Sequence, residues 1–228
     1  MESNSPWRGK FAAYILPMAV FMGSLALVSL VKGLGDSFWL ASAEYWLYPL
    51  QTIACAALLF WYRREYEFHH LAQIGFTIGI AVLVFVLWIS PQAFFGFAPR
   101  REGFNPDVFA AQPLAYWTTV LFRFLRLVII VPLVEEIFWR GFLLRYFINE
   151  KFDSVRFGQF SWLSFGVVTL GFTFAHSSAD WIAAAITGAL YNLVAYRTKS
   201  LVSCVVAHAV TNLLLGLWIM QTKQWGFW

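Results

Sequence analysis

Three charged residues stand inside one apolar stretch, and they are the residues best suited to chemistry. The stretch runs from Val131 to Leu144 and carries Glu135, Glu136 and Arg140. A charged side chain near the centre of a lipid-embedded helix costs roughly 2.5 to 3.5 kcal/mol. On a helix, Glu136 and Arg140 lie four residues apart on one face and can neutralise each other, whereas Glu135 points about 100° away from Glu136. This spacing predicts that Glu135 is an unpaired carboxylate.

Two histidines and an asparagine are further polar residues in apolar stretches of the C-terminal half. His176 lies near the end of Phe160–Ser177, and His208 and Asn212 lie within Leu201–Met220. A single histidine in such a place is explained by a hydrogen bond between helices. Because His208 and Asn212 are four residues apart, their side chains share one helix face. Costly polar groups in three separate stretches favour one shared site.

These residue types can hydrolyse a peptide bond without a covalent intermediate. Glu135 would accept a proton from water, and His176 would position that water or later protonate the leaving amine. His208 and Asn212 would donate hydrogen bonds to the oxygen of the carbonyl under attack. A zinc-dependent membrane hydrolase is an alternative, since glutamate and histidine bind zinc, although the sequence has no HExxH motif. Another is a non-catalytic binding or immunity protein that keeps the polar cluster for recognition or packing.

Taken together, the patterns resemble the three motifs of the CAAX prenyl protease and bacteriocin-processing family, the glutamic-type intramembrane proteases. The motifs are Glu135-Glu136 followed by Arg140, Phe172 followed by His176, and His208 followed by Asn212. The resemblance covers about residues 132–212, and no motif position departs from the family pattern.

The resemblance implies a role for each motif residue. Glu135 would be the catalytic carboxylate with His176 as its partner in activating water, and His208 and Asn212 would form the oxyanion site. The residues that support them would be Glu136, Arg140 and Phe172. No metal or other cofactor is expected in this mechanism.

The resemblance leaves several substrate classes open. Eukaryotic members remove the last three residues of prenylated CaaX proteins, whereas many prokaryotic members are linked to bacteriocin maturation, immunity or surface-protein sorting. This compact chain resembles the prokaryotic kind. We therefore expect a membrane-bound peptide or protein substrate, lipidated or not, and a prokaryotic plasma membrane as the location.

Composition predicts that the elements positioning these residues are membrane helices. Of the 228 residues, 60% are apolar and 12% are charged, against roughly 25% charged in soluble domains. We expect a single all-α membrane domain over residues 1–228, with the motif-bearing half at 127–212. An interfacial helix is expected over Val108–Arg126, and if Pro113–Arg126 crosses the membrane there are eight spans rather than seven. The seven expected spans are Phe11–Leu30, Tyr45–Tyr62, Leu71–Ser90, Leu127–Ile148, Phe160–Ser177, Ala179–Tyr196 and Leu201–Met220.

Positive charges predict an orientation rather than a nucleic-acid partner. The net charge is +4, but no basic run exceeds two residues, so the charge fits loops facing anionic lipid. With the N-terminus inside, nine Lys and Arg residues fall in inside segments: Arg8, Lys10, Arg63, Arg64, Arg145, Lys151, Arg156, Arg197 and Lys199. Four fall outside: Lys32, Arg100, Arg101 and Lys223. This bias favours a cytoplasmic N-terminus.

The sequence allows two roles for each of two other polar residues. Asp180, four residues after His176, either orients that imidazole or caps a helix. Asn192 fits a hydrogen bond between helices better than a place in the site.

Overall fold

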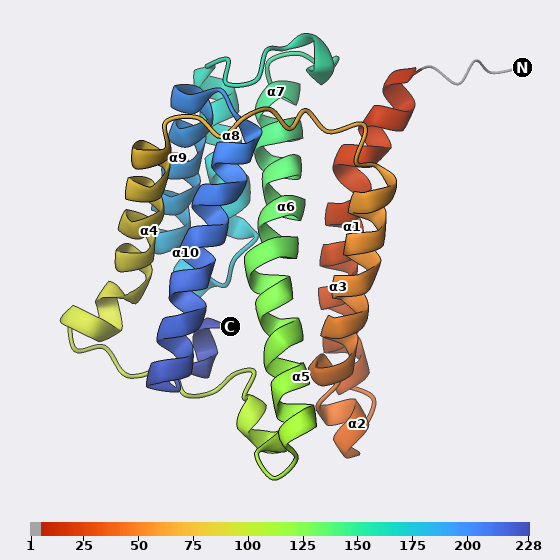
Figure 1. Cartoon of the computed structure of the whole chain (residues 1–228), viewed down its shortest axis with the longest axis vertical. Coiled ribbons are helices and arrows are strands. Elements are labelled where there is room, and N and C mark those ends of the chain that lie inside the picture. The colour runs from red at the N-terminus through yellow and green to blue at the C-terminus, as the bar shows by residue number, and fades with distance from the viewer. Residues whose placement is uncertain (1–5) are drawn as a thin grey trace, which may run out of the picture.

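The computed structural model describes residues 6–228, with side chains from residue 9 onward, and its regular structure is entirely helical in that range (Figure 1). The all-α fold class is therefore confirmed. Residues 1–5 and the side chain of Arg8, which entered the orientation count, lie outside the described residues. The α-helices are α1 (Pro6–Lys32), α2 (Phe38–Ala41), α3 (Glu44–Trp61), α4 (Ile74–Phe94), α5 (Pro113–Phe124), α6 (Val131–Glu136), α7 (Leu144–Tyr146), α8 (Trp162–Phe174), α9 (Trp181–Thr198) and α10 (Leu201–Thr222).

The helices α5, α6 and α7 form one continuous rod. Two stretches of π-helix, Leu125–Ile130 and Ile137–Leu143, join them into a helix that runs over Pro113–Tyr146. Its 34 residues correspond to about 51 Å at 1.5 Å per residue. The expected interfacial helix and the expected fourth span are thus one element, and Pro113–Arg126 is not a separate eighth crossing.

Two buried arginines explain why the helix does not break where an interface was expected. Arg123 lies in an aromatic cage, with its guanidinium carbon 4.8 Å from the ring centre of Phe104 and 5.4 Å from that of Tyr48. The Nε atom of Arg126 donates a hydrogen bond to Gln51 Oε1 at 2.6 Å. Arg123 is thus held by aromatic rings, while its Nε and Nη1 atoms have no hydrogen-bond partner in the described part of the chain. Both arginines are buried in the protein and not at the surface, where an interfacial helix would place them.

In the described part of the chain, four helices are long and apolar enough to cross a membrane. The expected count of about seven spans is therefore not confirmed. The helix α8 has 13 residues and is about 20 Å long, shorter than the roughly 30 Å of hydrocarbon in a bilayer. The helices α3 and α9 have 18 residues each and are not among the four candidates. The four candidates are Gly9–Lys32, Ile74–Phe94, Pro113–Tyr146 and Leu201–Thr222.

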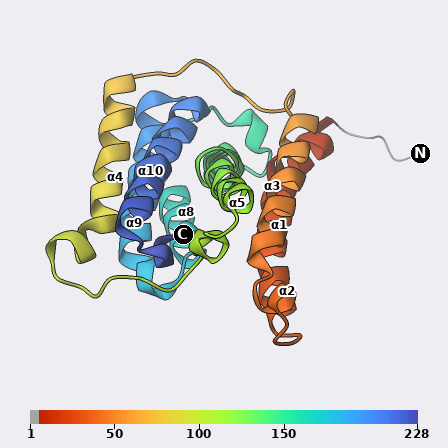
Figure 2. The same ribbon diagram turned by 60° about the horizontal axis from the view of Figure 1, so that its bottom comes forward.

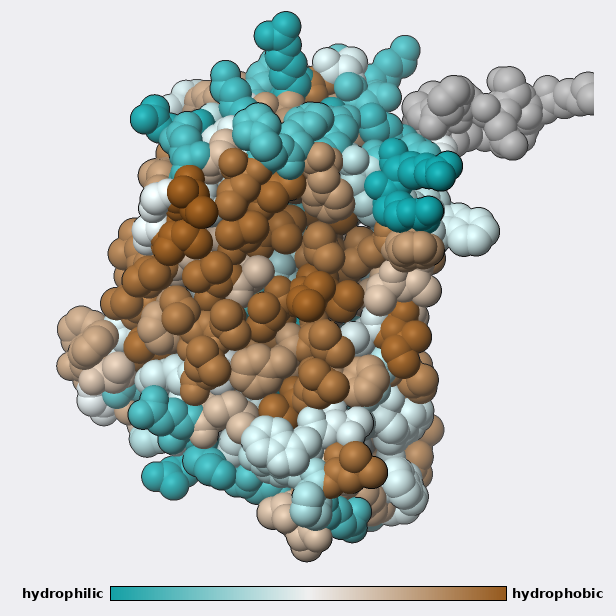
Figure 3. Space-filling model, viewed as in Figure 1, coloured by the Kyte–Doolittle hydropathy of each residue, from teal (hydrophilic) through white to brown (hydrophobic). Residues whose placement is uncertain are grey.

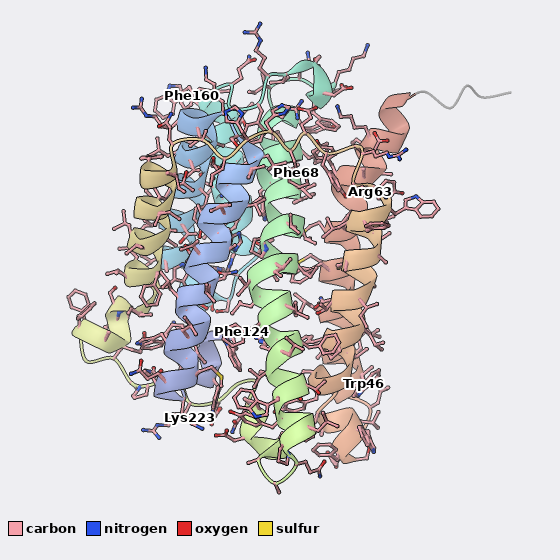
Figure 4. The ribbon with its side chains drawn as sticks, in the orientation of Figure 1. Trp46, Arg63, Phe68, Phe124, Phe160 and Lys223 are labelled. Carbon is pink, nitrogen blue, oxygen red and sulfur yellow. The ribbon has the colours of Figure 1, made fainter. Side chains whose placement is uncertain are left out.

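The long helix separates two groups of helices. Helices α1 and α3 pack together on one side, and α4, α8, α9 and α10 pack on the other (Figure 2). An apolar belt surrounds the middle of the face drawn in Figure 3, between two polar ends. Arg63 and Lys223 lie at opposite ends of the molecule (Figure 4). This distribution is the one expected of a protein embedded in a bilayer.

Close packing brings α10 against the long helix. A Cβ atom at Gly216 would lie 3.0 Å from the ring of Phe124, and Phe124 lies between the two helices in Figure 4. Val134, Ile137 and Ala207 are almost completely buried in the core nearby. The absence of a side chain at Gly216 therefore lets α10 approach close enough to share a site with α6.

Candidate active site

The four residues predicted to be catalytic line one cavity of about 340 Å³. Glu135 comes from α6, His176 from the turn after α8, and His208 and Asn212 from α10. His176 is held inside the bundle because α8 ends after 13 residues and the chain then turns back into α9. The structure thus brings together groups that lie up to 77 residues apart in the sequence, from 135 to 212.

Glu135 is the carboxylate without an ion-pair partner, as its place on the helix predicted. Its Oε2 atom is buried and accepts no hydrogen bond from the described part of the chain. Two further buried polar atoms on the cavity wall are unpartnered in the same sense, the hydroxyl of Tyr191 and Nε1 of Trp228. Because an unsatisfied buried polar group costs about 1 to 3 kcal/mol, these atoms favour a polar ligand in the cavity.

Glu136 forms hydrogen bonds with two other residues predicted for the site. Its Oε1 atom accepts a hydrogen bond from Arg140 Nη1 at 3.0 Å and another from His208 Nδ1 at 2.8 Å. The side chains of Glu136 and Arg140 are both fully buried. The predicted pairing of these two residues is confirmed, and the structure adds His208 to it. Glu136 therefore binds Arg140 and His208, while Glu135 lines the cavity.

Arg140 is held on all sides. Its Nε atom donates to Asn192 Oδ1 and its Nη2 atom to the Gly188 carbonyl, both at 3.1 Å. The rings of Phe172 and Tyr191 lie 4.9 and 5.4 Å from its guanidinium carbon. Asn192 does join helices, as expected, because its Nδ2 atom donates to Thr169 Oγ1 of α8 at 3.1 Å, and it binds a motif residue as well. The network fixes the second π-helical stretch, which contains Arg140, against α9.

The imidazole of His176 is oriented by its neighbours. Its Nδ1 atom lies 2.8 Å from the Phe172 carbonyl oxygen, which can only accept, so Nδ1 carries the proton and Nε2 is an acceptor in the neutral ring. The ring lies between those of Phe172, at 4.7 Å, and Trp88, at 5.8 Å. Trp88 is itself anchored, because its Nε1 atom donates to Thr187 Oγ1 at 2.8 Å.

His208 and Asn212 each keep one polar group for the cavity. Because His208 Nδ1 donates to the carboxylate of Glu136, its Nε2 atom donates only when the ring is protonated. Asn212 Nδ2 donates one hydrogen to the Leu127 carbonyl at 2.9 Å, which leaves its second hydrogen free. Leu127 lies in the first π-helical stretch, a local geometry that is frequent at functional sites.

Asp180 has neither of the two roles that its position suggested. It accepts no capping hydrogen bond from α9, and it binds Arg100 and Ser177 instead of His176. Arg100 Nη1 and the Ser177 hydroxyl each lie 2.6 Å from one of its carboxylate oxygens. This pair closes one wall of the cavity.

The segment Gln224–Trp228 completes that wall. The Gly226 N–H donates to the Arg100 carbonyl at 2.9 Å, and the Arg100 N–H donates to Gln224 Oε1 at 3.1 Å. Gly226 and Trp228 then line the cavity. The loop that holds Arg100 and the segment after α10 are thus joined to each other at the mouth of the site.

Sequence reasoning missed several residues of the cavity wall. Trp88, Tyr191 and Arg100 line the cavity but belong to no motif that the sequence displays. An aromatic residue in an apolar helix is ordinary, so neither Trp88 nor Tyr191 gave a signal. Arg100 lies in a loop that indicated only a turn.

The described residues contain no group of three or more His, Cys, Asp and Glu side chains that could hold a metal ion. Glu136 and His208 are in contact with each other, but Arg140 occupies the same carboxylate oxygen. The zinc alternative therefore has no ready set of ligands in this arrangement.

Comparison with known proteins agrees with the motifs. Residues 116–214 match the family described as type II CAAX prenyl endopeptidase Rce1-like. Comparisons with curated proteins and with solved structures give no match. The matched segment includes all three motifs and every residue predicted for the site. The part of the chain that builds the cavity from α6, α8 and α10 is therefore similar to the Rce1-like family of type II CAAX prenyl endopeptidases.

Proposed function

We propose that the chain is an intramembrane endopeptidase in which Glu135 and His176 activate water and His208 and Asn212 stabilise the oxyanion. One observation carries this proposal. The four side chains line a single cavity in which Glu135 Oε2 has no protein partner. The family match supports peptide hydrolysis as the reaction class.

The polar atoms facing the cavity suit an attack by water. Glu135 and Nε2 of His176 are both acceptors, so one water molecule can donate a hydrogen bond to each. The water oxygen attacks the carbonyl carbon as Glu135 takes a proton, and the carbonyl oxygen becomes an oxyanion. The proton then passes to the amide nitrogen, the C–N bond breaks, and the products are a carboxylic acid and an amine.

The oxyanion would be bound by donors from α10. Asn212 offers its second amide hydrogen, and His208 offers Nε2–H when its ring is protonated. Glu136 Oε1 orients the His208 ring through the 2.8 Å contact at Nδ1. Donors fixed in place before the reaction cost no reorganisation when the charge develops.

The substrate would be a peptide or protein at the membrane. The exposed apolar belt supports delivery of a membrane-bound substrate, and the family description supports a prenylated CaaX-type end. Processing of another prokaryotic peptide or of a sorting substrate is the second possibility carried by the motifs. The experiment therefore compares prenylated with unprenylated peptides.

Cleavage of a peptide library tests the proposal. The purified protein in detergent is given prenylated and unprenylated peptides, with Glu135→Gln as the test variant and Glu150→Gln, at an exposed loop position, as the control. We expect cleavage by the wild type and by Glu150→Gln, and a loss of about 10²- to 10⁴-fold in Glu135→Gln, which is the contribution of a general base.

The same assay separates the alternatives. Cleavage that a chelator stops and zinc restores would favour the zinc hydrolase. A wild type that binds a peptide but cuts none would favour the binding protein. Undiminished cleavage by a folded Glu135→Gln variant would remove the glutamate mechanism.

A further inference from the structure

One tyrosine on the cavity wall is not used by the proposed mechanism. Tyr191 of α9 is 1% exposed, lines the cavity, and has a buried hydroxyl without a hydrogen-bond partner in the described part of the chain. The Thr211 side chain is the nearest group that could bind this hydroxyl. The Thr211 hydroxyl itself donates to the carbonyls of Ala81 and Ala207, and no hydrogen bond forms between it and the Tyr191 hydroxyl. A buried hydroxyl beside a cavity is satisfied when a ligand in the cavity accepts its hydrogen.

The ring of Tyr191 is fixed against the two residues that flank Glu136. Its centre lies 5.2 Å from that of His208 and 5.4 Å from the guanidinium carbon of Arg140. Such packing fixes the ring among residues of the cavity wall. The hydroxyl is thus held on the same wall as His208, on a neighbouring helix.

The oxyanion site is short of donors without this hydroxyl. His208 Nδ1 is committed to Glu136, so the neutral ring presents an acceptor rather than a donor at Nε2. One hydrogen of Asn212 Nδ2 is committed to Leu127. A neutral His208 therefore leaves a single amide hydrogen for the oxyanion, whereas the Tyr191 hydroxyl donates in either state of the histidine.

We propose that Tyr191 is a further catalytic residue, whose hydroxyl donates a hydrogen bond to the oxygen of the substrate carbonyl as it becomes an oxyanion. This inference rests on the proposed function of the same cavity. Trp228 Nε1 is also unpartnered there, but Trp228 packs against Trp225 and Phe124 and not against His208. Its indole nitrogen has no comparable link to the oxyanion donors.

The Tyr191→Phe variant tests the proposal, because it removes the hydroxyl and keeps the ring against His208 and Arg140. A matched control exists on the same helix. Tyr196 also has a buried hydroxyl without a partner, but it packs against Phe160 and Phe165 and is not part of the cavity wall. We expect Tyr191→Phe to lower kcat by about 10²-fold, as for other oxyanion donors, and Tyr196→Phe to stay within about twofold of wild type.

A transition-state analogue gives a second readout. The probe is the aldehyde form of the peptide that the library identifies, whose hydrate carries a tetrahedral carbon. Tyr191→Phe should bind this aldehyde at least about tenfold more weakly than wild type does. Binding of the uncut peptide is measured in Glu135→Gln protein, which does not cut it. Adding Tyr191→Phe to that protein should leave the affinity for the peptide unchanged.

The outcomes for this residue and for the enzyme as a whole are distinct. If wild type cuts, Glu135→Gln does not, and Tyr191→Phe cuts at the wild-type rate, the role of Tyr191 is overturned and the proposed function stands. Equal losses in Tyr191→Phe and Tyr196→Phe, with lowered Tm in both, would make the effect structural and overturn the assignment. A wild type that cuts no peptide overturns both proposals.

Discussion

Two adjacent glutamates have opposite surroundings, and this difference is decided at the scale of single residues. Glu136 is fully buried and binds both Arg140 and His208. Glu135, one residue earlier, points into the cavity and has an unpartnered carboxylate oxygen. A carboxylate already engaged by a cation is a poor base for water, whereas an unengaged one is available. The same residue type therefore serves the fold at one position and the proposed chemistry at the next.

A first prediction compares the two glutamates. Glu136→Gln leaves the Arg140 guanidinium buried without a counter-charge, so we expect it to destabilise the protein by about 3 to 5 kcal/mol. In a chain of this size that corresponds to a fall in Tm on the order of 10 °C. Glu135→Gln removes no ion pair and should leave Tm within a few degrees of wild type. Thermal unfolding in detergent measures both, and equal Tm values for the two variants would contradict the buried-pair interpretation.

At the scale of elements, one wall of the cavity is formed by two segments that contact each other. The loop containing Arg100 and the segment Gln224–Trp228 are joined by one hydrogen bond between backbone groups and one from the Arg100 N–H to the Gln224 side chain. A Cβ atom at Gly103 would lie 2.3 Å from the Trp225 carbonyl oxygen. The two segments approach so closely at Gly103 that only glycine fits. This contact keeps Trp228 at the cavity wall.

The second prediction follows from that contact. Gly103→Ala should push the segment Gln224–Trp228 away from the cavity and lower peptide cleavage by up to about 10²-fold, since a 1 Å displacement near a site has effects of this size. Gly79→Ala in α4 is the control, because a Cβ atom there meets no atom within 4 Å. Cleavage rates of the two variants check this, and wild-type activity in Gly103→Ala would show that the segment is not needed for the site.

A polar cluster ties three elements together at the opposite end of the long helix. Glu67, in the loop between α3 and α4, binds Lys10 of α1 at 2.8 Å and Arg145 of α7 at 3.2 Å. Burial by itself raises the pKa of the Glu67 carboxyl. The hydrogen bond from Lys10 and the nearby charges of Arg145 and Lys10 outweigh burial and lower the pKa below its ordinary value.

The third prediction is the pH dependence of stability that this cluster produces. Because the folded-state pKa of Glu67 lies below its unfolded value, its contribution is complete at neutral pH. The contribution is lost as pH falls from about 4.3 through the folded-state pKa. Glu67→Gln should therefore lose less Tm than wild type between pH 6 and pH 3. Glu65→Gln, at an exposed neighbour, should follow wild type. Parallel curves for all three proteins would contradict the assignment.

At the scale of the whole molecule, the distribution of apolar and charged residues determines how the protein lies in the membrane. A wide apolar belt separates two polar ends, and the four helices that are long and apolar enough to cross run between those ends. The excess of Lys and Arg in alternate segments favours a cytoplasmic N-terminus. On that orientation Lys151 and Lys223, both exposed, face opposite sides.

The fourth prediction tests the orientation with single cysteines. In a background where Cys55 and Cys204 are replaced by serine, Lys223→Cys should react in intact cells with a maleimide that does not cross membranes. Lys151→Cys should react only after the cells are permeabilised. The Lys223–Asp107 ion pair that is lost is exposed and contributes about 1 kcal/mol or less. The reverse labelling pattern would invert the orientation.

The sequence by itself determined the features that depend on composition and on spacing within one helix. The excess of apolar residues requires a membrane and therefore helices. The four-residue spacing of Glu136 and Arg140 places them on one helical face wherever that helix lies, and the same rule leaves Glu135 unpaired. The resemblance to the CAAX prenyl protease family rested on three such local patterns.

Only the tertiary structure decided which helices meet and at what depth. The contact between His208 and Glu136 spans 72 residues, and the positions of Tyr191, Trp88 and Arg100 around the cavity follow from how α4, α9 and the loop before α5 pack. Helix crossings are set by close fits such as that at Gly216, which no periodic pattern encodes. The merging of two expected elements into one rod has the same cause, because the environment of Arg123 and Arg126 is created by residues distant in the chain.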